Sequence, residues 1–386
     1  VLPYGRMVTL RPARSAMLLS RKPVNRARAC PDGAGRHLFS PPLMLRLPRL
    51  LPFVLALSSA LSAAPAPTPA NPSTTPAARA VLAFLAGQES KPTGRVVSGQ
   101  FTGFWNQLNA TLPEEIHRTT GQWPAMVGVD YADFDRGGID TSGANRTALA
   151  YWRAGGLVTV SAHLANPANP QGGGLRDSGV DLASLLQPGT DTHRRWLRQL
   201  DEIAAGLQEL KDAGVVVLWR PFHEMNRASF WSGKKDPAVF GRVWRQMFDY
   251  FTREKHLDNL LWVYSPNHGG NADAYYPGDD CVDVVGLDAY TDHIDPAHIK
   301  GYAAVAARPK PFGFTEFGPH GSKNPPGDYD YRRFLAGVTK HFPRTVFVLC
   351  WDDNWTPIRN REAKAFYDDP RLLNRDGLPA ELTGKP

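Results

Sequence analysis

The sequence has few cysteines and no long hydrophobic run. Of its three cysteines, only Cys281 and Cys350 lie beyond residue 66, too few for the disulfide framework of a small secreted protein. A domain of about 300 residues can bury enough apolar surface to do without cross-links. No segment approaches the ~20 apolar residues that a transmembrane helix needs. We therefore expect a domain stabilised by its core, with both cysteines unpaired and no stable membrane insertion.

An excess of positive charge is also absent once the N-terminal region is set aside. Residues 1–66 hold ten of the 44 Lys and Arg residues but only one of the 37 Asp and Glu residues, which leaves 34 basic and 36 acidic residues in the rest. The basic isoelectric point of about 9.3 therefore comes from a segment that we expect to be removed. This argues against a nucleic-acid partner.

The first 77 residues divide into three segments. Residues 1–43 are rich in arginine without clear periodicity, and we interpret them as an extension before a true start at Met44. Residues 44–64 combine arginines, a short apolar core and small residues, which predicts a secretory signal peptide and a secreted protein, extracellular or periplasmic. Residues 65–77 are rich in Pro, Ala and Thr and indicate a flexible linker. We expect one folded domain over residues 78–386.

Within this domain, short apolar runs alternate with amphipathic stretches, the pattern of repeated βα units. The strand candidates are residues 95–99, 125–129, 157–162, 215–219, 260–264, 282–287, 311–314 and 345–349. The clearest helices are residues 193–213, followed by Gly214, and residues 237–254. Eight such units in about 300 residues predict a (β/α)8 TIM barrel, whose catalytic groups lie at the C-terminal ends of the strands. The alternative, a doubly wound open sheet, calls for a glycine-rich phosphate turn, which residues 99–103 match poorly.

Two of the predicted strands lead directly into a glutamate. The run 215–219 is followed by the heptapeptide RPFHEMN, which contains Glu224, and the run 311–314 is followed by Glu316. Two carboxyl groups at two strand ends can hydrolyse a glycosidic bond with retention of configuration, one as acid/base and one as nucleophile. The alternative is a non-catalytic carbohydrate-binding protein that uses its tryptophans as sugar platforms, but such a protein has no need for both glutamates.

A metal site has no support in the sequence. A helical His-Glu-x-x-His zinc site is excluded because Arg227, not histidine, stands four residues after His223. The histidines at 268, 293 and 298 show no recognisable ligand spacing. We expect no metal, no cofactor and a monomer.

The segments RPFHEMN and FTEFG resemble glycoside hydrolase family 26, a group of retaining (β/α)8 glycosidases, and the likeness covers nearly all of residues 90–380. The resemblance implies that Glu224 is the acid/base and Glu316 the nucleophile. Most family members cut β-1,4-mannan, while some act on mixed-linkage β-glucan or β-1,3-xylan. We therefore predict a secreted, mannanase-like glycoside hydrolase with a polysaccharide or oligosaccharide substrate, and keep the other two glycans as alternatives.

The resemblance also assigns three residues to the substrate site. His163, at the end of the third strand, would line the subsite of the sugar being cleaved, and Trp351 would form the floor of that subsite. Tyr290 would donate a hydrogen bond to the nucleophile. A lone histidine, tyrosine or tryptophan is more often an ordinary core residue, so each depends on its place at a strand end.

Three further residues complete the predicted site. We expect Arg220 to support the ionised nucleophile and His223 to orient the acid/base or meet the substrate, with structural packing as the alternative for His223. After the acid/base, the family commonly has an aromatic-rich stretch. In the corresponding residues 227–233, Trp231 is retained but serine stands at two positions where the family often has tryptophan. We therefore expect Trp231 to supply the main stacking face there.

Overall fold

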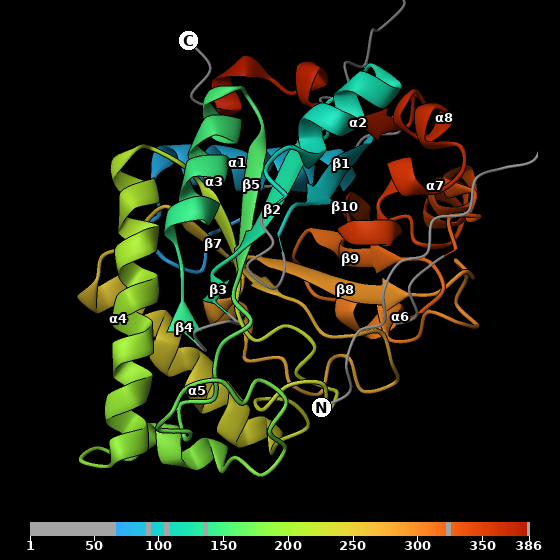
Figure 1. Cartoon of the computed structure of the whole chain (residues 1–386). Coiled ribbons are helices and arrows are strands. Elements are labelled where there is room, and N and C mark those ends of the chain that lie inside the picture. Colours follow the sequence, from blue (N-terminus) through green and yellow to red (C-terminus); the bar gives the residue numbers. More distant parts are fainter. Residues whose placement is uncertain (1–66, 90–93, 104–108, 134–137, 322–325, 384–386) are drawn as a thin grey trace, which may run out of the picture. The chain divides into compact units, whose positions relative to one another are not determined.

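The computed structural model of the protein describes residues 67–89, 94–103, 109–133, 138–321 and 326–383 (Figure 1). The extension and the signal peptide that we predict over residues 1–64 lie outside these ranges. Within them, no helix has both the length and the apolar character needed to cross a membrane.

Eight parallel strands close into a barrel. They are β1 (Val96–Phe101), β2 (Met126–Asp130), β5 (Leu157–Ser161), β6 (Val217–Arg220), β7 (Leu260–Tyr264), β8 (Val284–Tyr290), β9 (Phe312–Gly318) and β10 (Thr345–Cys350). Each strand pairs with the next, and β10 pairs with β1, with Val97 beside Phe347. Figure 1 shows the blue β1 alongside the red β10. Closure confirms the predicted TIM barrel and excludes the open sheet, which would have two free edges.

The remaining elements surround this barrel. The helices of the described ranges are α1 (Pro76–Glu89), α2 (Leu112–Thr120), α3 (Ser142–Arg153), α4 (Asp191–Asp212), α5 (Pro237–Asp249), α6 (Tyr302–Ala306), α7 (Tyr331–His341) and α8 (Ala363–Tyr367). Two short strands, β3 (Ala132–Asp133) and β4 (Gly138–Ile139), form an antiparallel pair, and β11 (Leu372–Leu373) pairs with β1. The barrel strands are buried on both faces, as expected for a parallel sheet covered by helices.

The two long helices lie close to their predicted positions. α4 begins after Thr190, whose Oγ1 accepts a hydrogen bond from the His193 amide at 3.2 Å, and Gly214 follows its end in a left-handed conformation with φ 74°. α5 begins after Asp236, whose carboxylate caps the first turn. The helix predicted to reach residue 254 changes at Tyr250 into a π-helical turn that ends at Glu254.

Strands β8 and β9 are longer than predicted. They stay paired as far as Tyr290 and Gly318, so that Tyr290 and Glu316 lie on the strands and not after them. The polar residues Asp288 and Glu316 suggested strand ends, but both are buried beside Arg220, which compensates their charge.

Packed structure begins before Ala78. The buried Asn71 donates a hydrogen bond from Nδ2 to Asp258 Oδ1 at 3.0 Å, and the Ala70 amide donates to Asp283 Oδ1 at 2.7 Å. Because these partners are about 200 residues away, the local composition could not indicate them. The linker interpretation of residues 65–77 therefore fails for the described residues 67–77.

The two cysteines of the domain are both buried and unpaired, as expected. Cys281 precedes β8, whereas Cys350 is the last residue of β10. They thus lie near opposite ends of parallel strands, too far apart for a disulfide.

Candidate active site

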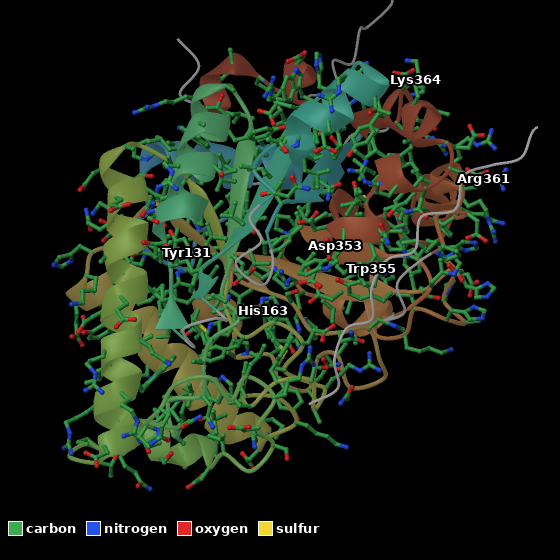
Figure 2. The ribbon with its side chains drawn as sticks, viewed as in Figure 1. Tyr131, His163, Asp353, Trp355, Arg361 and Lys364 are labelled. Atoms are coloured by element: carbon green, nitrogen blue, oxygen red, sulfur yellow. The ribbon has the colours of Figure 1, made fainter. Side chains whose placement is uncertain are left out.

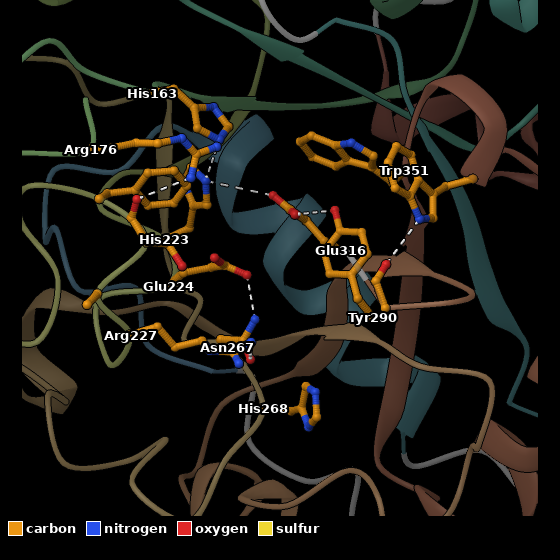
Figure 3. Close-up of a pocket in the computed structure, with 15 residues that line it drawn as sticks. His163, Arg176, His223, Glu224, Arg227, Asn267, His268, Tyr290, Glu316 and Trp351 are labelled. Carbon is orange, nitrogen blue, oxygen red and sulfur yellow. Dashed lines mark hydrogen bonds and ion pairs between the residues drawn. The ribbon is translucent and has the colours of Figure 1, made fainter. Parts of the chain in front are cut away.

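A pocket of about 660 Å³ opens at the C-terminal ends of the barrel strands. It contains both predicted catalytic glutamates, and Figure 3 shows their carboxyl groups facing the same hollow. His163 and Trp355, labelled in Figure 2, lie on its wall. The other lining residues are Arg176, His223, Arg227, Ala228, Ser229, Phe230, Asn267, His268, Tyr290, Gly321 and Trp351. The two glutamates selected by the strand-end rule for TIM barrels therefore line one pocket.

Glu316 is buried and held by two donors. Arg220 Nη2 donates to its Oε1 at 2.6 Å, and the Tyr290 hydroxyl donates to its Oε2 at 2.7 Å. The three residues come from β9, β6 and β8, and so the barrel itself fixes their geometry. Charge-assisted hydrogen bonds to both oxygens favour the ionised carboxylate and fix its orientation.

Arg220 forms ion pairs with two carboxyl groups. Besides Glu316 it contacts Asp288, whose Oδ2 lies 3.3 Å from Arg220 Nη1. The Ser265 and Thr315 hydroxyls donate to Asp288 Oδ1. Burial and the nearby Glu316 charge raise the pKa of Asp288 well above its usual range. Burial also raises the pKa of Glu316; Arg220 opposes this rise and the Glu224 carboxylate adds to it. A single guanidinium therefore compensates two buried carboxyl groups.

Glu224 has a different environment. It follows the end of β6, is partly exposed, and has a left-handed backbone with φ 56°, which costs a non-glycine residue roughly 1–2 kcal/mol. Its amide donates to Ser265 O at 2.8 Å, which stabilises this conformation. Asn267 Nδ2 donates to its Oε1. One neutral donor and solvent access suit a group that must gain and lose a proton.

His163 and His223 belong to a buried hydrogen-bonded chain. Their Nε2 atoms lie 2.8 Å apart, and His163 Nδ1 lies 2.8 Å from Asp130 Oδ2. Burial and the neighbouring His163 and Arg220 charges lower the pKa of His223 well below its usual value, so His223 is neutral. Its Nε2 lies 3.9 Å from Glu316 Oε1. The chain thus fixes the orientation of both imidazoles beside Glu316.

The aromatic residues divide into pocket walls and core. Trp351 lines the pocket and stacks on Phe101, with ring centroids 4.3 Å apart. Trp231, which we expected to stack on substrate, is only 1% exposed, and its Nε1 donates to Leu164 O at 2.8 Å. Phe230 lines the pocket in its place. The prediction for Trp231 is wrong because the turn after Glu224 directs the side chain of Phe230, and not that of Trp231, into the pocket.

The sequence reasoning missed three polar residues of the site. Asp130 ends β2, one position after a predicted strand, so the rule that found the glutamates could also have found it. Asn267 likewise follows the predicted strand 260–264 by three residues. Asp288 directly follows the predicted strand 282–287, so the same rule could have found it as well.

One cluster of potential metal ligands lies outside the pocket lining. The ligand atoms of His293, Asp295 and His298 all lie within 4.8 Å of one another, a proximity that their sequence spacing did not indicate. The Asp295 carboxylate accepts hydrogen bonds from the Ala297 and His298 amides, and His298 Nδ1 lies 2.9 Å from Asp295 Oδ1. These mutual contacts account for the arrangement, and we assign no metal to it.

The chain is similar to several known proteins, and those named here are all mannanases. The chain is 36% identical over 326 residues to a mannan endo-1,4-beta-mannosidase of Bacillus subtilis, covering 79% of this chain and 88% of the relative. It is also 36% identical to mannan endo-1,4-beta-mannosidase A and B of Caldalkalibacillus mannanilyticus, covering 79% of this chain and 62% of that longer protein. The solved structure of a B. subtilis mannanase superposes with a TM-score of 0.74 at 35% identity, over 80% of this chain and 95% of the other.

The family model for glycosyl hydrolase family 26 matches residues 70–377, which include the whole barrel. The chain therefore belongs to glycosyl hydrolase family 26, which confirms the resemblance drawn from its motifs and the prediction of a glycoside hydrolase.

Proposed function

We propose that this protein hydrolyses β-1,4-mannosidic bonds of mannan-type polysaccharides with retention of configuration, using Glu316 as nucleophile and Glu224 as acid/base. The observation that carries the proposal is the pair of glutamates in one pocket with opposite environments. Glu316 is clamped by Arg220 and Tyr290, whereas Glu224 is partly exposed with one amide donor. Two identical side chains can take different roles when their surroundings differ in this way.

In the first step, a Glu316 oxygen attacks the anomeric carbon and forms a glycosyl ester. The bond to the leaving-group oxygen breaks, and that oxygen takes the proton of Glu224. In the second step, Glu224 removes a proton from water, the water oxygen bonds to the anomeric carbon, and the ester bond to Glu316 breaks. Arg220 and Tyr290 hold the Glu316 carboxylate in position before attack and after its release.

The walls of the pocket fit a sugar substrate. Trp351 and Phe230 offer apolar faces, while His163 and His223 offer imidazole edges beside Glu316. A concave site with aromatic walls and a few fixed polar groups is typical of carbohydrate binding. Mannan is the favoured substrate because the relatives named above are mannan endo-1,4-beta-mannosidases. Mixed-linkage β-glucan and β-1,3-xylan are the alternatives.

We also propose that the enzyme is exported from the cell. The leader predicted over residues 44–64 would carry the enzyme to a polymeric substrate that cannot enter the cell. Expression of the full chain with N-terminal sequencing of the released protein tests it, and cleavage near residue 64 is the expected result.

The mechanism is tested with two variants and two substrates. Glu316→Ala should abolish cleavage of both mannan and 2,4-dinitrophenyl β-mannobioside. Glu224→Ala should lose mannan cleavage but keep kcat/KM for the dinitrophenyl substrate, whose leaving group needs no protonation. Proton NMR of the first-formed product should find the β-anomer. An α-anomer would contradict retention, and wild-type mannan cleavage by Glu224→Ala would contradict the assigned acid/base.

A further inference from the structure

Arg227 is an exposed cation on the pocket wall, three residues after the acid/base. No carboxylate in the described part of the chain forms an ion pair with it. Instead, its Nη1 donates a hydrogen bond to Asn267 Oδ1 at 2.9 Å, and Asn267 Nδ2 in turn donates to Glu224 Oε1 (Figure 3). The guanidinium is therefore linked to the acid/base through one amide.

The backbone of Asn267 is clamped. Its amide donates to Asn226 Oδ1 at 2.9 Å, and Asn226 Nδ2 donates back to Asn267 O at 2.7 Å. Asn267 is 1% exposed, so its side chain has little room to adopt another rotamer. The remaining freedom is an exchange of Oδ1 and Nδ2 by rotation of the amide plane.

Arg227 removes that freedom. A guanidinium has donors and no acceptor, so the atom that faces it must be Oδ1. Rotation of the amide would set N–H against N–H at Arg227 and oxygen against oxygen at Glu224. Because a buried polar group that loses its hydrogen bond is destabilising, the observed orientation is strongly preferred. Arg227 thereby ensures that Asn267 donates to Glu224.

We propose that Arg227 is a positioning residue for the acid step: through Asn267 it holds Glu224 Oε1 as a hydrogen-bond acceptor and so leaves the acidic proton on Oε2. Glu224 Oε2 has no hydrogen-bond partner among the described residues, so it can present the proton to the leaving-group oxygen. If Asn267 turned its Oδ1 towards Glu224, the carboxyl proton would be drawn to Oε1 and away from the substrate. This inference rests on the role of Glu224 proposed above.

The first test compares substrates that do and do not need the proton. Arg227→Met keeps the apolar stem but removes the donors, and should lower kcat/KM for mannotetraose about tenfold, part of the 10²–10⁴ that general acid catalysis contributes. The same variant should change kcat/KM for 2,4-dinitrophenyl β-mannobioside less than about twofold, since that step needs no acid. Arg227→Lys, which can still donate to Asn267 Oδ1, should recover much of the loss. An equal loss on both substrates would overturn the proposal.

Arg176 is the matched control. It is an exposed arginine on the same pocket, but its guanidinium lies 5.9 Å from the Phe230 ring centroid, and its Nη1 donates to Ser229 O and not to Asn267. Whatever Arg176→Met does to substrate binding, it should change the two kcat/KM values by the same factor. A selective loss in this variant would indicate that any pocket arginine produces the effect, which would contradict the specific role of Arg227.

A double-mutant cycle separates positioning from direct substrate contact. If Arg227 acts through Asn267, then Arg227→Met should have no further effect on mannotetraose cleavage in an Asn267→Ala background. A full tenfold loss in that background would overturn the proposal. The failure of this inference and of the proposed function are distinguishable: wild-type mannan cleavage by Glu224→Ala would refute the acid/base assignment itself, whatever Arg227→Met does.

Discussion

The two halves of the site differ in how they hold a glutamate. Glu316 lies on β9, 3% exposed, between an arginine and a tyrosine from two other barrel strands. Glu224 lies on the loop after β6, partly exposed and in a left-handed conformation, and Asn267 donates a hydrogen bond to its carboxyl group. In the roles proposed above, Glu316 as nucleophile must stay ionised in one place, and strand support provides this. Glu224 as acid/base must exchange its proton with substrate and water, and a loop at the pocket wall allows it.

The largest effect should come from removing the cation beside Glu316. Arg220→Met would leave Glu316 and Asp288 buried without a counter-charge, and breaking a buried ion pair typically costs about 3–5 kcal/mol. We expect a comparable loss in the free energy of unfolding, measured in urea, and loss of activity.

The control for this change is a surface arginine. Arg245 forms an exposed ion pair with Asp280, so Arg245→Met should cost about 0–1 kcal/mol and leave activity intact. Equal stability losses in Arg220→Met and Arg245→Met would show that the buried arginine contributes no more to stability than the exposed one.

A smaller effect on activity is expected from changes in the loop that carries Glu224, although the loss of stability can be as large. Trp231 is a core residue beneath this loop, so Trp231→Ala should cost about 3–5 kcal/mol of stability. Its neighbour Phe230 is partly buried on the pocket wall, and Phe230→Ala should mainly lower kcat/KM, by the equivalent of about 1–3 kcal/mol of apolar contact. Chemical unfolding and kinetics of both variants check the division. A stable Trp231→Ala protein with a raised KM would restore the stacking role predicted from sequence.

The smallest effect concerns pH. Because burial raises the pKa of Glu316, activity should decline, as the pH falls, at a higher pH than for an ordinary carboxyl group. The Tyr290 hydroxyl stays protonated, since burial and the Glu316 charge raise its own pKa, and it stabilises ionised Glu316. Tyr290→Phe removes this donor, so the pKa of Glu316 rises and the acidic limb of the kcat/KM profile should move upwards by about one pH unit. A shift to lower pH would show that the hydroxyl does not support the carboxylate.

Much of the barrel could be predicted because its signals are local. All eight strand candidates correspond to barrel strands, since apolar runs buried on both faces and bounded by helical stretches are visible in a short window of sequence. The positions of Glu224 and Glu316 followed from the rule that strand ends carry the chemistry. The strand ends themselves were less predictable: β8 and β9 extend through polar residues whose charges are compensated only in three dimensions.

The sequence by itself thus determined the strand order, the TIM barrel and the pair of glutamates, because hydrophobic periodicity and strand-end position are properties of neighbouring residues. Only the tertiary structure decided which side chains form hydrogen bonds with those glutamates. Arg220 reaches Glu316 across 96 positions, and Asn267 reaches Glu224 across 43. It also decided that Phe230 and not Trp231 faces the substrate pocket, because the direction of a loop side chain depends on backbone conformation and on hydrogen-bond partners such as Leu164 that are distant in the chain.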